Sequence, residues 1–193
     1  STGPSANGRN TDGFHIVQLA SSRDRLEWKR LGDRKPFINS SRREGGAYDM
    51  TGMIGPTAAL RRDDELWFYY TGVKYRRTPA KPTVDRGAIN LAAIRVDGFI
   101  SLDATDTEGI VQTKPFSVPG GKLHVNVDAP KGELRVELLN GDGNVVAKSK
   151  PLTGDLLREP VQWAEGDIAD LKGRIASLRF TLRNAQFYSY WLE

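Results

Sequence analysis

The sequence contains no cysteine among its 193 residues, so neither a disulfide framework nor a thiolate metal site is possible. It has only two histidines, His15 and His124, and their separation gives no helical spacing of the kind found in zinc sites. We therefore expect no metal ion and no cofactor.

Long hydrophobic runs are also missing. No apolar stretch approaches the ~20 residues that a membrane helix needs, so no membrane partner is expected. The chain begins at Ser1 and shows no basic segment followed by an apolar one, the pattern of a signal peptide. We expect a mature, truncated or processed product whose export signal, if any, lies outside these residues.

Charge of one sign is not concentrated either. The net charge is +4, but 28 basic residues face 24 acidic ones and the two kinds interleave. The densest basic pieces lie at 42–43, 61–62 and 74–77, and none joins a zinc finger, a helix-turn-helix pattern or a basic helix. The sequence predicts a mildly basic, solvated surface and no nucleic-acid partner.

What the sequence does contain is a series of strand patterns. In the first part we expect three hairpins, which pair 14–22 with 26–31, 53–61 with 65–73, and 87–96 with 98–104 around Asp97-Gly98. Segment 74–86 is a basic, proline-bearing loop. No long amphipathic helix is present, so the fold class is all-β.

After about residue 106 the turns recur every 8–12 residues, which is typical of a β-sandwich or barrel. One helical turn is expected at 167–173, capped by Asp167 and ended by Gly173. Alternation predicts one buried face. Its members are Leu123, Val125, Val127, Leu134, Val136, Leu138, Trp163, Leu178, Phe180 and Leu182.

The first part differs because its strands are apolar on both faces. The stretch "IGPTAAL" at 54–60 is small and apolar throughout, whereas "LWFYY" at 66–70 is large throughout. Strands of this kind need a layer on each side, which three hairpins cannot supply. A β-propeller can, because its blades pack face to face with small residues near the axis. Residues 14–31 then read as the outer half of one blade and 47–104 as the next blade.

Three stretches resemble a known superfamily. "IVQLASSRDRLEWKR" and "AYDMTGMIGPTAAL…DELWFYYTG" are similar to strand pairs of the five-bladed propeller glycosidases, which include invertases, levansucrases and arabinanases. "GKLHVNVDAPKGELRVELLNGDGNVVAKS…DLKGRIASLRFTLRNAQFYSYW" resembles the β-sandwich appended to bacterial proteins of that type. The resemblance implies terminal blades of a five-bladed β-propeller at 1–106 and a jelly-roll-like β-sandwich at 107–193. It also implies an extracellular or periplasmic location.

The family's catalytic motifs are absent from the chain. The resemblance places a nucleophile or base early in the first blade and a proton donor in a middle blade, and the "NDPNG", Arg-Asp-Pro and Glu-Cys motifs are all missing. The expected partners are therefore a carbohydrate and the remaining blades, as a separate or cleaved chain. The catalytic residues stay unknown, and most of the catalytic carboxylates are expected outside this chain.

Asp49 is the best candidate for an auxiliary acid, because an acid upstream of an innermost strand lies at the rim where substrates enter a propeller. The alternative is that Asp49 caps the turn after Gly45-Gly46. Tyr48 is a candidate platform for a sugar ring, and Glu44 is a candidate second acid. Arg42 and Arg43 are candidates for binding an acidic sugar, a sulfate or a phosphate. The alternative is that both arginines are solvated surface residues.

Two functions from different classes follow. The first is the C-terminal portion of a glycoside hydrolase acting on a poly- or oligosaccharide, which closes the propeller and supplies substrate contacts. The second is a non-catalytic carbohydrate-binding or adhesion protein whose sandwich binds the glycan. A scaffold whose open blade edge pairs with another chain is a third reading.

Overall fold

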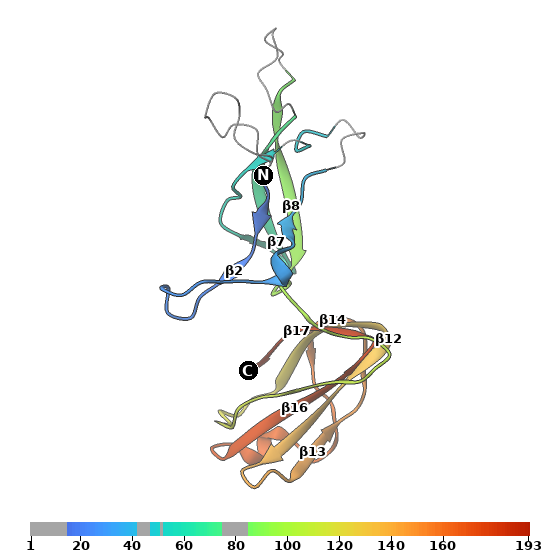
Figure 1. Cartoon of the computed structure of the whole chain (residues 1–193). Helices are drawn as coiled ribbons and strands as arrows, with labels where there is room; N and C mark the ends of the chain where they lie inside the picture. The colour runs from blue at the N-terminus through green and yellow to red at the C-terminus, as the bar shows by residue number, and fades with distance from the viewer. Residues whose placement is uncertain (1–14, 42–46, 51, 75–84) are drawn as a thin grey trace. The chain divides into compact units, whose positions relative to one another are not determined.

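A computed structural model describes residues 15–41, 47–50, 52–74 and 85–193. The chain forms two compact units, Ser1–Val96 and Asp97–Glu193. Within the described residues every regular element is a β-strand, apart from the 3-10 turns η1 (Gly32–Arg34) and η3 (Ile168–Leu171). The predicted all-β class is confirmed (Figure 1).

The first unit contains an antiparallel sheet centred on β7 (Glu65–Val73). On one side β7 pairs with β5 (Gly52–Ile54) and β6 (Leu60–Arg62), and on the other with β8 (Gly87–Arg95) along all nine residues. The predicted hairpin of 53–61 with 65–73 is thus confirmed, with a break around Pro56.

Two short ladders complete the described part of the first unit. β2 (Ala20–Ser21) pairs with β3 (Lys29–Arg30), which confirms the hairpin expected at 14–31 but with much shorter strands. β1 (Val17–Gln18) pairs with β4 (Pro36–Ile38).

The two faces of the β7–β8 sheet have different surroundings. On one face Phe68 and Tyr70 are buried with Ile38 and Met53, and the ring of Phe37 lies edge-on to Phe68 at 5.7 Å between centroids. On the other face Tyr69, Ile89 and Leu91 are exposed. Tyr69 lies opposite Leu91 in the ladder, so these side chains form one bare apolar surface.

The third expected hairpin is wrong. β9 (Leu102–Ala104) does not return along β8 but pairs with β17 (Ala185–Leu192) in the second unit. The chain turns over residues 96–99, and Val96 N–H donates to the Asp64 carbonyl instead of opening a two-residue hairpin. The division between the units falls at residues 96 and 97, ten residues before the expected domain boundary.

In the second unit β9 and eight further strands form a single sheet that curls into a nearly closed, barrel-like structure (Figure 1). The other strands are β10 (Gly109–Gln112), β11 (Phe116–Ser117), β12 (Leu123–Asn140), β13 (Val145–Ser149), β14 (Leu152–Pro160), β15 (Trp163–Glu165), β16 (Ile175–Arg183) and β17.

β12 runs without a break through residues 129–132, although Pro130 and Gly132 are residues typical of turns. Its first half pairs with β14 and β17, and its second half mainly with β13 and β16. Pro130 falls where the register with β14 shifts, so its missing N–H does not interrupt the strand. Gly132 allows β12 to pass close to the backbone at Arg183, because a Cβ at residue 132 would lie 1.9 Å from the Arg183 carbonyl oxygen.

The predicted core of the second unit is confirmed. Nine of the ten expected residues are buried in one cluster, and Trp163 packs against it half-buried. The expected helical turn is η3, where the Asp167 carboxylate accepts a hydrogen bond from Ala169 N–H and Gly173 follows with a φ of 76°.

Among the residues that the structure describes, none lies in a helix with the length and hydrophobicity needed to span a bilayer.

Candidate functional site

Asp49 lies in the turn just before β5, next to the end of β7. The Tyr70 hydroxyl donates to Asp49 Oδ2 over 2.8 Å, and Ser41 provides a second hydrogen bond. The Asp49 residue is only 5% exposed. A buried carboxylate is tolerated when hydrogen bonds replace its lost hydration, so Ser41 and Tyr70 make this position possible.

The protonation states of the pair follow from these contacts. Burial acts to raise the pKa of Asp49, but the hydrogen bonds from Ser41 and Tyr70 outweigh it and hold the pKa below its ordinary value. Burial and the neighbouring Asp49 carboxylate raise the pKa of Tyr70 to about 12. At neutral pH the site therefore holds a fixed negative charge beside a neutral phenol.

Gly72 allows the turn to approach β7 closely. A Cβ on Gly72 would lie 2.4 Å from Asn90 Nδ2, 2.9 Å from Asp49 Cβ and 2.9 Å from the Tyr48 carbonyl oxygen. Real Cβ atoms do not approach other atoms so closely, so any larger residue at 72 would push the turn away.

A second group of side chains anchors the same turn. Lys74 Nζ lies 2.6 Å from Asp85 Oδ2 and 4.9 Å from the centre of the Tyr48 ring. Hydrogen bonds from Lys74 and Tyr48 lower the pKa of Asp85. Lys74 and Asp85 flank the β7–β8 connection, so this group joins that connection to Tyr48.

The structure brings two of the five predicted site residues together. Tyr48 and Asp49 lie in one turn against β7, while Arg42, Arg43 and Glu44 lie outside the described residues. The carboxylate of Asp49 is hydrogen-bonded to Ser41 and Tyr70, and these contacts anchor the turn that holds Tyr48 and Asp49.

Sequence reasoning missed Tyr70, Lys74 and Asp85. The alternation of β7 carries a signal for Tyr70, since it lies two residues from Phe68 and must share its face. No comparable signal identifies Asp85, because its partner Lys74 is eleven residues away across the loop.

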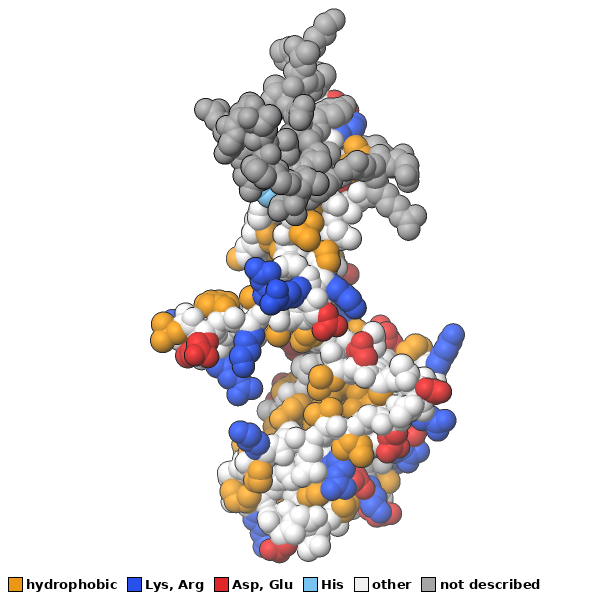
Figure 2. Space-filling model, viewed as in Figure 1, with side chains coloured by type: hydrophobic (Ala, Val, Ile, Leu, Met, Phe, Trp, Pro, Cys, Tyr) orange, Lys and Arg blue, Asp and Glu red, His pale blue; other side chains and the backbone are white. Residues whose placement is uncertain are grey.

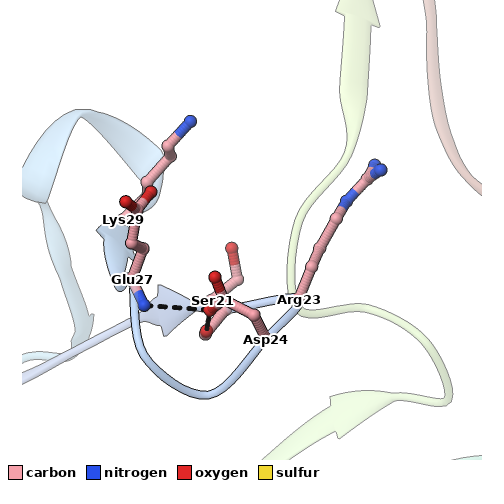
Figure 3. A pocket seen from close by; sticks show the side chains of 6 residues that line it. Ser21, Arg23, Asp24, Glu27 and Lys29 are labelled. Atoms are coloured by element: carbon pink, nitrogen blue, oxygen red, sulfur yellow. Dashed lines mark hydrogen bonds between the residues drawn. The ribbon is translucent and has the colours of Figure 1, made fainter.

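A separate hollow of about 240 Å³ lies at the β2–β3 turn, lined by Ser21, Ser22, Arg23, Asp24, Glu27 and Lys29 (Figure 3). The Asp24 carboxylate accepts hydrogen bonds from Leu26 N–H, Glu27 N–H and the Ser22 hydroxyl, all near 2.9 Å. These bonds lower the pKa of Asp24, the Glu27 amide having the largest effect. These hydrogen bonds all lie within residues 22–27, so we assign Asp24 the role of stabilising the turn.

The described ranges contain no group of three or more His, Asp or Glu side chains placed to hold a metal ion. His124 lies on the outer face of β12, with its ring 5.4 Å from that of Trp191.

Comparisons of this chain with protein-family models, with curated proteins and with solved structures each gave no match. Its function has to be argued from its own residues.

Proposed function

We propose that this chain is the C-terminal portion of a five-bladed β-propeller glycoside hydrolase, followed by a jelly-roll-like β-sandwich. In this proposal the β7–β8 sheet belongs to the closing blade, and Tyr48 and Asp49 stand at the sugar-facing rim. The sequence resemblance over residues 16–30, 47–72 and 121–191 supports it.

The observation that carries the proposal is the buried, ionised carboxylate of Asp49 at the end of an apolar sheet. A fixed negative charge in a weakly polar site acts on neighbouring ionisable groups over several ångströms. Near a catalytic carboxyl group from another blade, it would favour the protonated form of that group and raise its pKa. Glycoside hydrolysis needs one carboxyl group in that state as the general acid.

The bare face of the sheet supports the presence of another blade. Ile89 is 76% exposed and Leu91 44% exposed on a strand whose other face is packed. A large apolar patch of this kind is typical of an interaction surface. A neighbouring blade would cover it.

The test is the pH profile of turnover in the protein that contains all five blades, either as one polypeptide or reconstituted from two. Asp49→Asn keeps the size of the side chain and an oxygen that accepts from Tyr70, but removes the charge. We expect the alkaline limb of kcat/KM to shift to lower pH, because the general acid loses the charge that raises its pKa.

Asp63→Asn is the matched control. Asp63 lies in the β6–β7 turn at the other end of β7, about 23 Å away at ~3.3 Å per strand residue. Its left-handed backbone, with a φ of 51°, suits asparagine. A profile that Asp49→Asn and Asp63→Asn leave equally unchanged would overturn the role of Asp49. Glycan binding without any turnover would establish the carbohydrate-binding alternative instead.

A further inference from the structure

The outer face of the second unit carries a hollow of about 400 Å³ that spans β10, β12, β13 and β16. It lies on the side of the sheet opposite the core, since its polar residues on β12 and β16 alternate with the core residues Leu134, Val136, Phe180 and Leu182. Its lining consists of Glu108, Ile110, Arg135, Val136, Glu137, Lys148, Ser149, Arg179 and Thr181.

Three polar side chains of this hollow, Arg179, Glu137 and Lys148, belong to a row across the strands that Gln112 and Glu165 extend beyond the hollow. Successive strand pairings align Gln112 with Arg179, Arg179 with Glu137, Glu137 with Lys148, and Lys148 with Glu165. Neighbouring strands are about 4.8 Å apart, so the row offers alternating donors and acceptors over about 19 Å. A long, narrow ligand fits such a row better than a compact one.

Hydrogen bonds hold the two guanidinium groups in fixed orientations. Arg135 binds both carboxylate oxygens of Glu133, at 2.8 and 3.1 Å. Arg179 donates to Glu137 Oε2 over 3.0 Å and to Gln112 Oε1 over 3.3 Å. Each guanidinium has five N–H donors, and three on each have no hydrogen-bond partner within the described ranges. Arg179 is the better held of the two, because its partners come from two neighbouring strands and its side chain is 33% exposed, so a ligand that binds it loses less side-chain entropy.

The balance of charge indicates the class of ligand. Three basic and two acidic side chains line the hollow, and on the face of this unit shown in Figure 2 basic and acidic groups are interspersed. A strongly anionic ligand would meet Glu108 and Glu137, and a cationic one would meet the two arginines. A ligand that both donates and accepts hydrogen bonds at neighbouring positions satisfies both kinds of group.

Ile110 supplies an apolar element at the edge of the row. It is 62% exposed and lies opposite Thr181, which in turn lies opposite Arg135. A sugar ring presents hydroxyl groups around its rim and C–H groups on its faces, which matches this combination of polar row and exposed aliphatic side chain.

We infer that this face of the second unit binds a neutral oligosaccharide along the row from Gln112 to Glu165. The inference does not rest on the role proposed for Asp49, since every residue involved belongs to Asp97–Glu193. It assigns a second glycan site, apart from any catalytic one.

The experiment titrates the full chain with four neutral hexasaccharides (cellohexaose, xylohexaose, laminarihexaose and maltohexaose) and with hexagalacturonate as the anionic counterpart, by calorimetry and amide NMR. We expect at least one neutral hexasaccharide to bind and to shift amide signals in β12 and β16. Arg135→Ala and Glu137→Gln should each weaken that binding at least tenfold. Lys114→Ala, in the exposed loop after β10, should leave it unchanged.

Both test variants are expected to fold, because the Arg135 side chain is 52% exposed and glutamine keeps the shape of Glu137. Thermal unfolding of each variant verifies this. Binding of hexagalacturonate alone, falling steeply with salt, would overturn the neutral class. The absence of binding by all four neutral sugars, or binding that Arg135→Ala and Glu137→Gln do not change, would overturn the site.

Discussion

The two units are nearly equal in length and both consist of antiparallel strands, yet they bury their apolar side chains differently. In Asp97–Glu193, 19 buried hydrophobic residues form one cluster. In the described part of Ser1–Val96 the corresponding cluster has four: Ile38, Met53, Phe68 and Tyr70. The second unit therefore encloses its own core, whereas in the described part of the first unit Tyr69, Ile89 and Leu91 stay exposed on one face of the sheet.

Strand length explains the difference. β12 has 18 residues and pairs with four strands, so the sheet can curl around one side and enclose it. β7 has nine residues, and among the described residues the short strands β1 and β4 pack on one face of its sheet. Buried and exposed residues thus alternate along both β12 and β7, but the longer strand encloses a core and the shorter one has a packed face and an exposed face.

Removal of a core side chain should have the largest effect, and only in the second unit. Phe180 is fully buried, with its ring centroid 4.6 Å from that of Phe187 and 5.1 Å from that of Tyr190. Phe180→Ala should lower the free energy of unfolding of this unit by about 3–5 kcal/mol, through lost transfer energy and the cavity left behind. Hydrogen exchange measured in β16 and in β7 checks this for each unit separately.

Leu102→Ala is the control in the same unit, because Leu102 is 53% exposed and should cost less than about 0.5 kcal/mol. Faster exchange in β7 as well as β16 for Phe180→Ala would contradict the independence of the two units.

A methyl group at Gly72 should have the next largest effect, confined to the first unit. Because a Cβ would lie within 3 Å of Asn90, Asp49 and Tyr48, Gly72→Ala should destabilise the unit by about 1–3 kcal/mol. Gly55→Ala is the matched control, since nothing lies within 4 Å of a Cβ there. Equal unfolding midpoints in urea for the two variants would show that the turn at Tyr48–Asp49 can move freely.

The sequence was sufficient to predict the buried face of the second unit, because its residues alternate strictly and the face needs no partner outside the unit. It was not sufficient for the path of the chain after β8. Asp97-Gly98 is a strong local hairpin signal, but Leu102–Ala104 gains a longer-range pairing with β17. At this position the local preference for a turn competes with a pairing between distant strands, and a short segment of sequence does not predict such a pairing.

The candidate site was predictable only in part for the same reason. Asp49 and Tyr48 stand beside a glycine pair and an apolar strand, which a reader of the sequence can see. The partner of Asp49 is Tyr70, 21 residues away, and Gly72 is required by the close approach of a turn from another part of the chain. Such contacts become visible only when β7 is placed against the turn.

The hydrogen bond between Tyr70 and Asp49 should produce a smaller, pH-dependent effect. The pKa of Tyr70 is raised to about 12 in the folded protein, above the ordinary tyrosine value of 10.0. The stabilisation is therefore fully present below about pH 10 and is lost as the pH rises toward 12. Tyr70→Phe should cost about 1–3 kcal/mol at neutral pH, because it leaves a buried acceptor with one partner fewer.

Urea unfolding of wild type and Tyr70→Phe at pH 8, 10 and 11.5 measures this difference. The two free energies of unfolding should converge as the pH rises.

For Asp49 the pH dependence has the opposite sign. Its lowered pKa gives stability at neutral pH, and this stability is lost as the pH falls through the pKa of Asp49 in the folded protein. Asp49→Asn should abolish that acid-side loss in the first unit.

The smallest effect on stability is expected for a substitution on the exposed face of the first unit. It contrasts most with the substitution of a buried side chain in the second unit. Leu91 is 44% exposed, so Leu91→Ser should change the free energy of unfolding by less than about 0.5 kcal/mol. The same substitution should instead reduce self-association at high protein concentration, because Leu91 and Tyr69 form part of an exposed apolar surface. Sedimentation velocity of wild type and Leu91→Ser over a range of concentrations measures this. A stability loss of several kcal/mol would mean that Leu91 already packs inside the unit, and would contradict the proposal that a neighbouring blade covers this face.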